Sequence, residues 1–141
     1  MKIFIGQVYI RPGINYPFSC YFQKWLGEEL TKLVKPSEFF IKTYSDEYSL
    51  IFRMSAKSEI IEPEIFGPTV FKKDKKVEFT IFLPHGGKQE NLNKEYIVPL
   101  TILLNSIIKI FRTMGIDVSA VEKKTSILIN QIISDKRMLD N

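Results

Sequence analysis

The sequence holds very little of what catalysis or metal binding requires. Among 141 residues there is one histidine, His85, and one cysteine, Cys20. The chain has no glycine-rich phosphate loop and no carboxylate pair in a recognisable setting, and no His/Cys cluster has the spacing of metal ligands. These absences argue against a metalloenzyme and against a nucleotide-dependent enzyme. They predict a protein that is not an enzyme and that needs no cofactor.

Other absences concern the compartment. A single cysteine excludes an intramolecular disulfide, which favours a reducing environment. The apolar run 3–5 near the N-terminus is too short for a secretory signal and is followed by no cleavage site. The longest apolar stretch, 97–111, is interrupted by Pro99 and several polar residues, so it is too short and too polar to span a bilayer. We therefore expect a soluble, cytoplasmic protein.

What the sequence does contain is the composition of an ordinary globular domain. Its hydrophobic content is 45%, its aromatic content 13% and its charged content 26%. This length is most simply one domain spanning residues 1–141, large enough to bury a core without a metal or a disulfide. The net charge of +4 is spread along the chain rather than gathered in one arm, which is a weak basis for binding a polyanion.

The spacing of apolar residues predicts the order of secondary structure. Gly27, in the middle of the first predicted helix, is expected to mark close packing against the sheet. Ser119 and Glu122 have the spacing of a capping box at the start of the last helix. The predicted elements are a strand at 2–10, a helix at 16–34, a hairpin of strands 39–44 and 48–54, an irregular segment 57–68 that its prolines limit to an edge, a hairpin of 69–71 with 77–83, a helix at 98–114, a helix from 119, and a frayed tail at 135–141.

This order lacks the strand–helix alternation of a doubly wound parallel sheet. It favours an α+β domain, with a mostly antiparallel sheet of about five strands, one N-terminal helix and two C-terminal helices. The periodicity does not decide whether the helices share one face of the sheet or flank both.

Two side chains could carry chemistry on their own. His85 lies in Pro84-His85-Gly86-Gly87, where it could act as a general base, but no motif supplies the nucleophile or second acid that it would need. The same four residues also serve as a strand terminator, and we favour that interpretation. Cys20 begins the first helix, where the helix dipole could lower the pKa of its thiol. Its aromatic neighbours instead favour a small, buried apolar side chain.

Charged and aromatic loop residues are better candidates for binding. The lysine-rich turn 72–76 could bind phosphates or an acidic protein, and Phe71 and Phe79 beside it would either stack on bases or point inward. The glutamates of 59–64 form either a solvated edge or a contact for a basic partner. A loop tyrosine before the first helix could serve as an anchor. The candidate partner-binding residues are Arg11, Tyr16, Glu59, Glu62, Glu64, Lys72, Lys73, Lys75 and Lys76.

The C-terminal half carries a resemblance. A strand ending in Ile81-Phe82-Leu83-Pro84 leads to Tyr96-Ile97-Val98-Pro99-Leu100, a long helix closes at Met114-Gly115-Ile116-Asp117, and an amphipathic helix follows. Together with the opening strand and helix, this layout resembles the bacterial immunity proteins of contact-dependent growth inhibition and related polymorphic toxin systems.

The resemblance implies a non-enzymatic cytoplasmic inhibitor that binds the toxin domain of a partner, commonly a nuclease. It transfers no residue roles. Inhibitors that mimic nucleic acid tend to be acidic, whereas this chain is net basic. The resemblance therefore implies contact with an acidic toxin surface or an exosite. The alternative function is a nucleic-acid-binding module that uses the lysines of 72–76.

Overall fold

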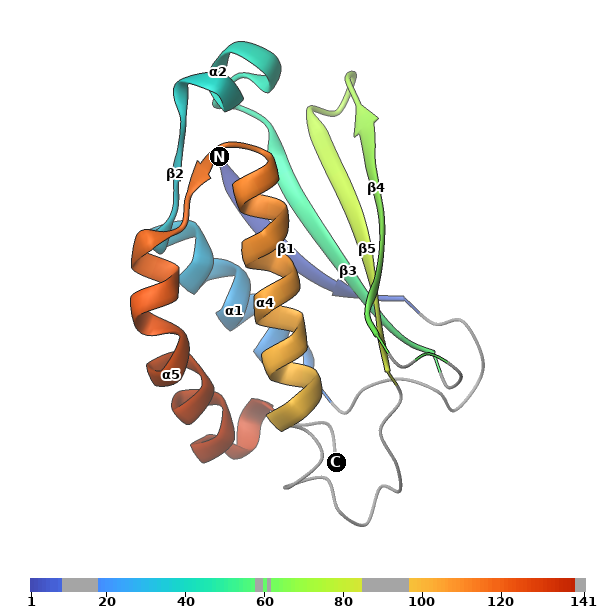
Figure 1. The fold of residues 1–141 in the computed structure, drawn as a ribbon, viewed down its shortest axis with the longest axis vertical. Helices are drawn as coiled ribbons and strands as arrows, with labels where there is room; N and C mark the ends of the chain where they lie inside the picture. The colour runs from blue at the N-terminus through green and yellow to red at the C-terminus, as the bar shows by residue number, and fades with distance from the viewer. Residues whose placement is uncertain (9–17, 58–59, 61, 85–96, 139–141) are drawn as a thin grey trace.

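The fold is built on a four-stranded sheet with helices against one face (Figure 1). The computed structural model describes residues 1–8, 18–57, 60, 62–84 and 97–138. In chain order the elements are β1 (Lys2–Gln7), α1 (Cys20–Leu33), β2 (Lys35–Pro36), α2 (Glu38–Tyr44), β3 (Ser49–Lys57), β4 (Glu64–Phe71), β5 (Lys76–Pro84), α4 (Ile97–Thr113), β6 (Ile116–Asp117), α5 (Ser119–Ser134) and the 3₁₀ helix η2 (Lys136–Met138).

The main sheet is mixed, with the strand order β1-β3-β5-β4. β3 pairs in parallel with both β1 and β5, and only β4 runs antiparallel, beside β5. A separate two-stranded sheet joins β2 to β6. The α+β class is confirmed, but the prediction of a mostly antiparallel sheet of about five strands is wrong. Two helices lie between β1 and β3, and a connection of that length allows the chain to return in the parallel direction.

The largest local error concerns residues 39–44, which were predicted to be a strand and form helix α2. Ser37 caps this helix, because its side chain accepts a hydrogen bond from the backbone N–H of Phe40 at 3.3 Å. Ser45 ends the helix at a φ of 66°, a left-handed conformation that does not continue a helix. Phe40 is the only fully buried side chain of α2. The predicted hairpin between 39–44 and 48–54 therefore does not exist.

The second predicted hairpin is confirmed. β4 and β5 pair in antiparallel register, and a tight turn at 72–75 joins them. β4 lies at the edge of the sheet, as the prolines of this segment predicted. Its register shifts between Phe66 and Thr69, the interval that contains Gly67 and Pro68. Since proline has no backbone N–H to donate, it is tolerated at this interruption.

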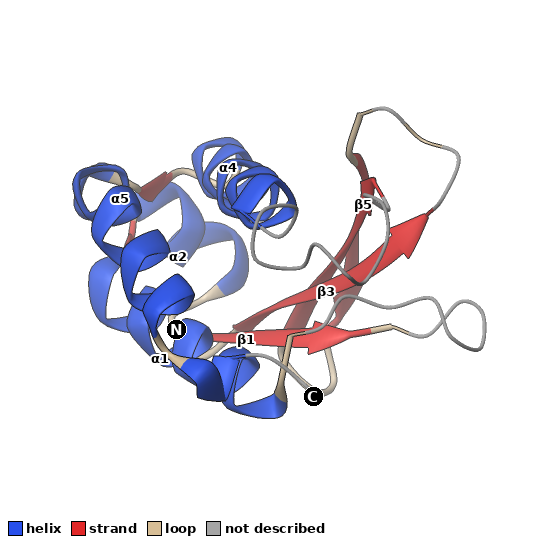
Figure 2. Ribbon diagram, turned by 90° about the horizontal axis from the view of Figure 1, so that it is seen from below, coloured by secondary structure: helices blue, strands red, loops and turns tan. Residues whose placement is uncertain are grey.

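The core lies between the sheet and α4. Leu50, Phe52, Met54 and Ala56 alternate along β3 and are buried on one face. The ring of Phe111 on α4 meets Phe52 edge-on, with ring centres 5.4 Å apart. The predicted apolar stripe of α4 is confirmed, since its members are all buried: Leu100, Leu103, Leu104, Ile107, Ile108 and Phe111. Helix α5 packs against α4 and α1 rather than on the sheet (Figure 2).

Helix α1 lies alongside β1 (Figure 2). It buries Phe22, Leu26 and Leu30, and Gly27 faces the main chain of β1. A Cβ atom on Gly27 would lie 2.8 Å from the carbonyl oxygen of Ile3. The expectation that Gly27 marks close packing on the sheet is therefore confirmed.

The C-terminal segment differs from the prediction at both ends of α5. Val118 is the N-cap and makes no side-chain cap bond, so the predicted capping box of Ser119 and Glu122 does not form. Ser119 instead donates its backbone N–H to the Asp117 carboxylate at 3.0 Å. Beyond α5, Met138 is buried in η2 and accepts a hydrogen bond from the backbone N–H of Ser19. Residues 135–138 are thus ordered into the fold and are not a frayed tail.

The contact at Gly27 gives a stability prediction. Gly27→Ala forces a methyl group against the Ile3 carbonyl, so we expect a loss of about 1–3 kcal/mol in the free energy of unfolding, measured by urea denaturation. Gly6→Ala is the matched control, because a Cβ atom at Gly6 meets nothing within 4 Å. We expect this control to be neutral or slightly stabilising. Equal losses for both variants would contradict the close-packing interpretation.

Candidate functional site

The face of the main sheet that points away from α4 is the candidate functional site, and we call it the open face. Burial alternates along β1, β3 and β5, so one residue in two points away from the core. The register places these outward residues in rows across the strands, with Phe4 beside Ile51, and Ile51 beside Glu78. The open face consists of Lys2, Phe4, Ile51, Arg53, Lys57, Glu64, Phe66, Thr69, Phe71, Lys76, Glu78, Thr80 and Phe82.

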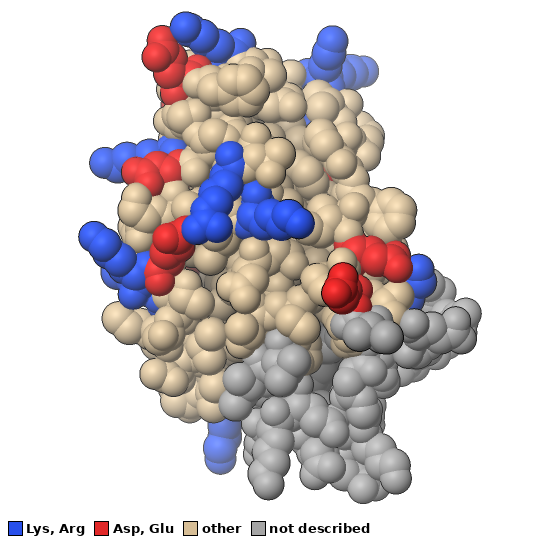
Figure 3. All heavy atoms as spheres, in the orientation of Figure 1, with Lys and Arg blue, Asp and Glu red and all other residues tan. Residues whose placement is uncertain are grey.

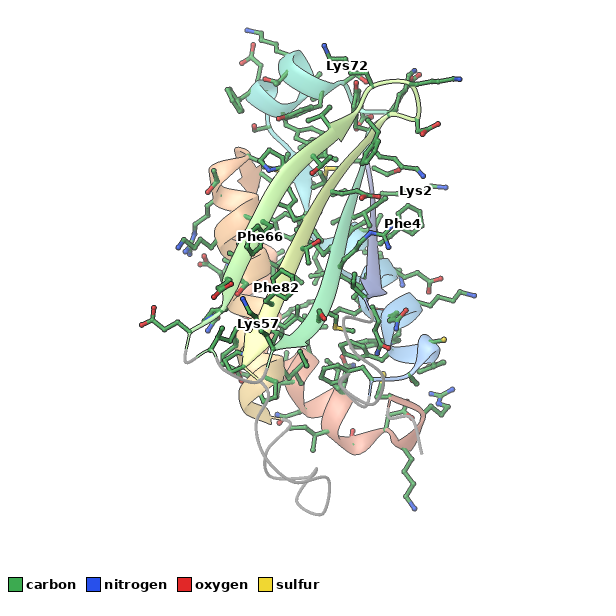
Figure 4. The ribbon with its side chains drawn as sticks, turned by 90° about the vertical axis from the view of Figure 1, so that its right-hand side faces the viewer. Lys2, Phe4, Lys57, Phe66, Lys72 and Phe82 are labelled. Atoms are coloured by element: carbon green, nitrogen blue, oxygen red, sulfur yellow. The ribbon has the colours of Figure 1, made fainter. Side chains whose placement is uncertain are left out.

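Aromatic side chains are unusually frequent on this face. Phe4, Phe66 and Phe71 have exposed fractions of 50%, 56% and 40%. Phe66 contacts the half-buried Phe82 edge-on, with ring centres 5.2 Å apart. Figure 4 shows these two rings together on β4 and β5, with Phe4 at the opposite edge of the sheet, on β1. A solvent-facing sheet surface is normally polar, so several exposed rings on one face are a departure from that pattern.

The open face also carries two ion pairs. Arg53 lies 3.2 Å from Glu78, and Lys57 lies 3.1 Å from Glu64. The Lys57 ammonium group also lies 5.7 Å from the ring centre of Phe82. All four charged groups are partly exposed, so each pair contributes at most about 1 kcal/mol to stability. The pairs place two carboxylates, Glu64 and Glu78, among the aromatic rings, and the neighbouring Lys57 and Arg53 balance their negative charge.

The lysine-rich turn lies at one end of the open face. Lys75 forms an ion pair with Glu47, which precedes β3. The hydrogen bond from Lys75 and its positive charge lower the pKa of Glu47, and the same contact raises the pKa of Lys75. Lys72, Lys73 and Lys76 are exposed and make no ion pair within the described part of the chain. The turn therefore presents three ammonium groups without an ion-pair partner among the described residues.

The two aromatic residues beside this turn lie on opposite faces. Phe79 is buried in the core, as one interpretation of the sequence held. Phe71 lies opposite Lys76 on the open face, so the expectation that it points inward is wrong. Phe71 therefore brings an exposed ring to the end of the sheet that carries the lysines.

The other predicted binding residues are brought together only in part. Glu64 lies on the open face and is engaged by Lys57, and Glu62 is exposed just before β4. Three predicted positions, Arg11, Tyr16 and Glu59, lie outside the described residues, as does His85.

Cys20 is exposed at the start of α1, so the expectation that it would be a buried apolar side chain is wrong. Within the described residues, no group of three or more His, Cys, Asp or Glu side chains is placed to hold a metal ion. No helix in that part of the chain combines the length and apolar character that crossing a membrane requires.

Sequence reasoning missed Phe4, Phe66 and Phe82 as site residues. Phe4 stands between Ile3 and Ile5 in a continuous apolar run, so no alternation marks it as outward-facing. The signal for Phe82 was present, because it alternates with Ile81 and Leu83 on a strand whose other face is buried. Recognising it required knowledge of which sheet face the helices cover.

The helical side of the molecule offers a contrasting surface. In Figure 3, Lys and Arg side chains lie close to Asp and Glu side chains over this side, without a broad area of one sign. One such neighbour pair is Arg112 on α4 with Glu122 on α5.

Comparisons with known proteins add no assignment. No protein-family model matches the sequence. Curated proteins give no match, and solved structures give none. The function of the open face must be argued from its own chemistry.

The contact between Lys75 and Glu47 can be tested by titration. We expect the Glu47 carboxyl group to titrate below its ordinary pKa, followed by NMR of the side-chain carboxyl carbon. Lys75→Met removes the hydrogen bond and the charge, so the pKa of Glu47 should rise toward its ordinary value. Lys72→Met removes a charge from the same turn without touching Glu47, and it should leave the titration unchanged. An unshifted Glu47 in the unmodified chain would contradict the ion pair.

Proposed function

We propose that this chain is a protein-binding protein that catalyses no reaction and uses its open face to bind one partner protein. The observation that carries the proposal is the exposure of Phe4, Phe66 and Phe71 on a single sheet face. Exposed apolar surface of this kind, with charged residues around it, is typical of protein-binding sites. Aromatic side chains also provide much of the energy at such interfaces.

The charges of the open face indicate what the partner presents. Glu64 and Glu78 are balanced by neighbouring basic groups, whereas Lys2 and Lys76 make no ion pair within the described residues. The three unpaired lysines of the turn add further positive charge at the end of this face. A complementary partner surface therefore presents apolar groups to the exposed rings and acidic groups to the unpaired lysines, and the acidic groups speed association and fix its orientation.

We further propose that the partner is a toxin domain, which the chain would neutralise as an immunity protein by stoichiometric binding. This part of the proposal rests on the resemblance of the sequence layout to immunity proteins. Acidic groups on the partner agree with contact at an exosite, because a net basic inhibitor is poorly suited to mimic nucleic acid.

Nucleic-acid binding is the second candidate, and the lysine-rich turn favours it. Lys72, Lys73 and Lys76 are exposed cations, and the exposed ring of Phe71 lies beside them. Such a combination suits a single strand, with phosphates on the lysines and a base on the ring. Glu78 argues against extending that site across the sheet, because its carboxylate would face the phosphate backbone. We therefore rank protein binding first.

The test begins with identification of the partner. The tagged chain is expressed in its native host and purified at physiological salt, with a high-salt wash in parallel. Any protein retained at a 1:1 ratio is then made separately and tested for toxicity in cells with and without this chain. A toxic protein whose effect this chain abolishes supports the immunity proposal. A non-toxic partner supports only the protein-binding part.

The open face is then tested directly with that partner. Phe4→Ser and Phe66→Ser each remove an exposed anchor, so each should weaken binding by about thirtyfold, or about 2 kcal/mol, in calorimetry. Phe39→Ser is the matched control, since Phe39 is 60% exposed on α2, away from the open face. The control should bind normally. Equal effects of all three substitutions, or of none, would contradict the assignment of this face.

Two further outcomes would assign a different function to the chain. A chain that forms a dimer by light scattering, and that becomes a monomer with Phe66→Ser, would identify a second copy as the occupant of the open face. Single-stranded oligonucleotide binding that falls steeply with salt, and that disappears when the four lysines of the turn are neutralised, would establish the nucleic-acid function instead.

A further inference from the structure

A groove of about 620 Å³ runs between β1 and α1, at the border of the open face. Its strand side is formed by residues 2–5 of β1, and its helix side extends from Cys20 to Lys32 along α1. From Cys20 to Lys32 the helix advances by twelve residues at about 1.5 Å each, so this side of the groove is about 18 Å long. Figures 2 and 4 show α1 alongside β1, so the groove lies beside the sheet rather than beneath it.

The surface of the groove as a whole is mainly apolar, and its bottom is closed. The Ile3 backbone N–H donates to the Thr31 hydroxyl at 3.0 Å, and this hydroxyl donates to the Gly27 carbonyl at 2.7 Å. The close contact of Gly27 with the Ile3 carbonyl fills the space beside it. These polar groups are satisfied within the protein, so they do not call for a polar ligand. The half-exposed ring of Phe4 adds an apolar wall.

The rim of the groove is mainly basic. It carries Lys2, Lys24 and Lys32 against the single carboxylate of Glu28. Lys32 pairs with Glu29 at 3.5 Å, while Lys2 and Lys24 have no ion pair among the described residues. An apolar groove with unpaired cations at its rim is suited to a ligand that has one anionic end and an apolar body.

We propose that this groove binds a small apolar carboxylate, of the type of a medium-chain fatty acid. The chain lies against Phe4 and the closed bottom of the groove, and the carboxylate lies near Lys24. The geometry favours a small molecule over an added peptide strand. Val8 donates to Met54 of β3, so even-numbered β1 residues face β3 and the backbone groups of Ile3 face outward. Helix α1 already occupies those groups, and this prevents continuous strand pairing along β1.

This inference rests on the groove and not on the proposed partner. Lys24, Gly27 and Cys20 belong to the groove but not to the open face. Substitutions on the α1 side therefore test the groove alone.

The single cysteine provides a local readout. Cys20 is exposed and lines the groove, so a bound ligand should shield its thiol. We would measure the rate of alkylation by iodoacetamide, a neutral reagent, with increasing decanoate below its micelle concentration. We expect decanoate to slow alkylation several-fold and in a saturable manner. Decanol and decyltrimethylammonium, which have the same chain without the negative charge, should protect much less.

Charge reversal then locates the anion. Lys24→Glu should weaken decanoate protection by about fivefold, the upper end of what an exposed ion pair contributes. Lys72→Glu makes the same charge change at the distant turn and should leave protection unchanged. Each variant is compared with its own alkylation rate without ligand, because the substitution at Lys24 also alters the surroundings of the thiol.

Backbone amide shifts in NMR provide the second measurement. Decanoate should move the signals of Ile5 and Gly27 and leave those of Phe66 and Thr80 unchanged. Equal protection by decanoate and decanol would overturn the role of the lysines. Shifts confined to Phe66 and Thr80 would place the ligand on the open face and overturn the groove site. The absence of both protection and shifts would overturn the inference while leaving the proposed partner protein untouched.

Discussion

Phe52 lies at the centre of the fold, with the ring of Phe79 beside it and the ring of Phe111 edge-on against it. The ring centres are 5.8 Å and 5.4 Å apart, respectively. Phe52 belongs to β3, the strand that pairs with both β1 and β5, and Phe111 belongs to α4. This contact joins the middle of the sheet to its main covering helix. Aromatic contacts of this kind add to the energy of the area that they bury, so the helix is held on this face.

Because all the covering helices pack on one side of the main sheet, the other face stays exposed. Helix α5 adds to the layer of α4 and α1, and the side of β3 that carries Ile51 and Arg53 stays open. Both edges of the sheet are also protected against strand addition. Helix α1 occupies the edge of β1, and the shift of register around Pro68 interrupts the edge of β4. Strand addition is therefore disfavoured at both edges, whereas the open face presents exposed rings.

The parts of the fold that sequence could predict are those with a strong local signal. The stripe of α4 follows helical spacing over about three turns. The β4–β5 hairpin has strand-forming residues on both sides of a polar turn. The prediction for the residues of α2 was wrong because its aromatic and β-branched residues favour a strand. The cap by Ser37 and the surrounding fold favour a helix instead. The parallel pairing of β3 could not be predicted, because no local pattern encodes which strands meet. The open face depends on that pairing, so the charged turn was predicted, whereas Phe4, Phe66 and Phe82 were not.

The contact between the start of α1 and η2 joins segments that are far apart in the sequence. The Ser19 hydroxyl caps α1 through the N–H of Phe22 at 3.1 Å, and it donates to the carbonyl of Arg137. The Ser19 N–H donates to the carbonyl of Met138. During translation, α1 is made early and its partner residues emerge more than a hundred residues later. The packing around Phe18 and Phe22 is therefore incomplete until Met138 has left the exit tunnel, and this end of the core closes only then.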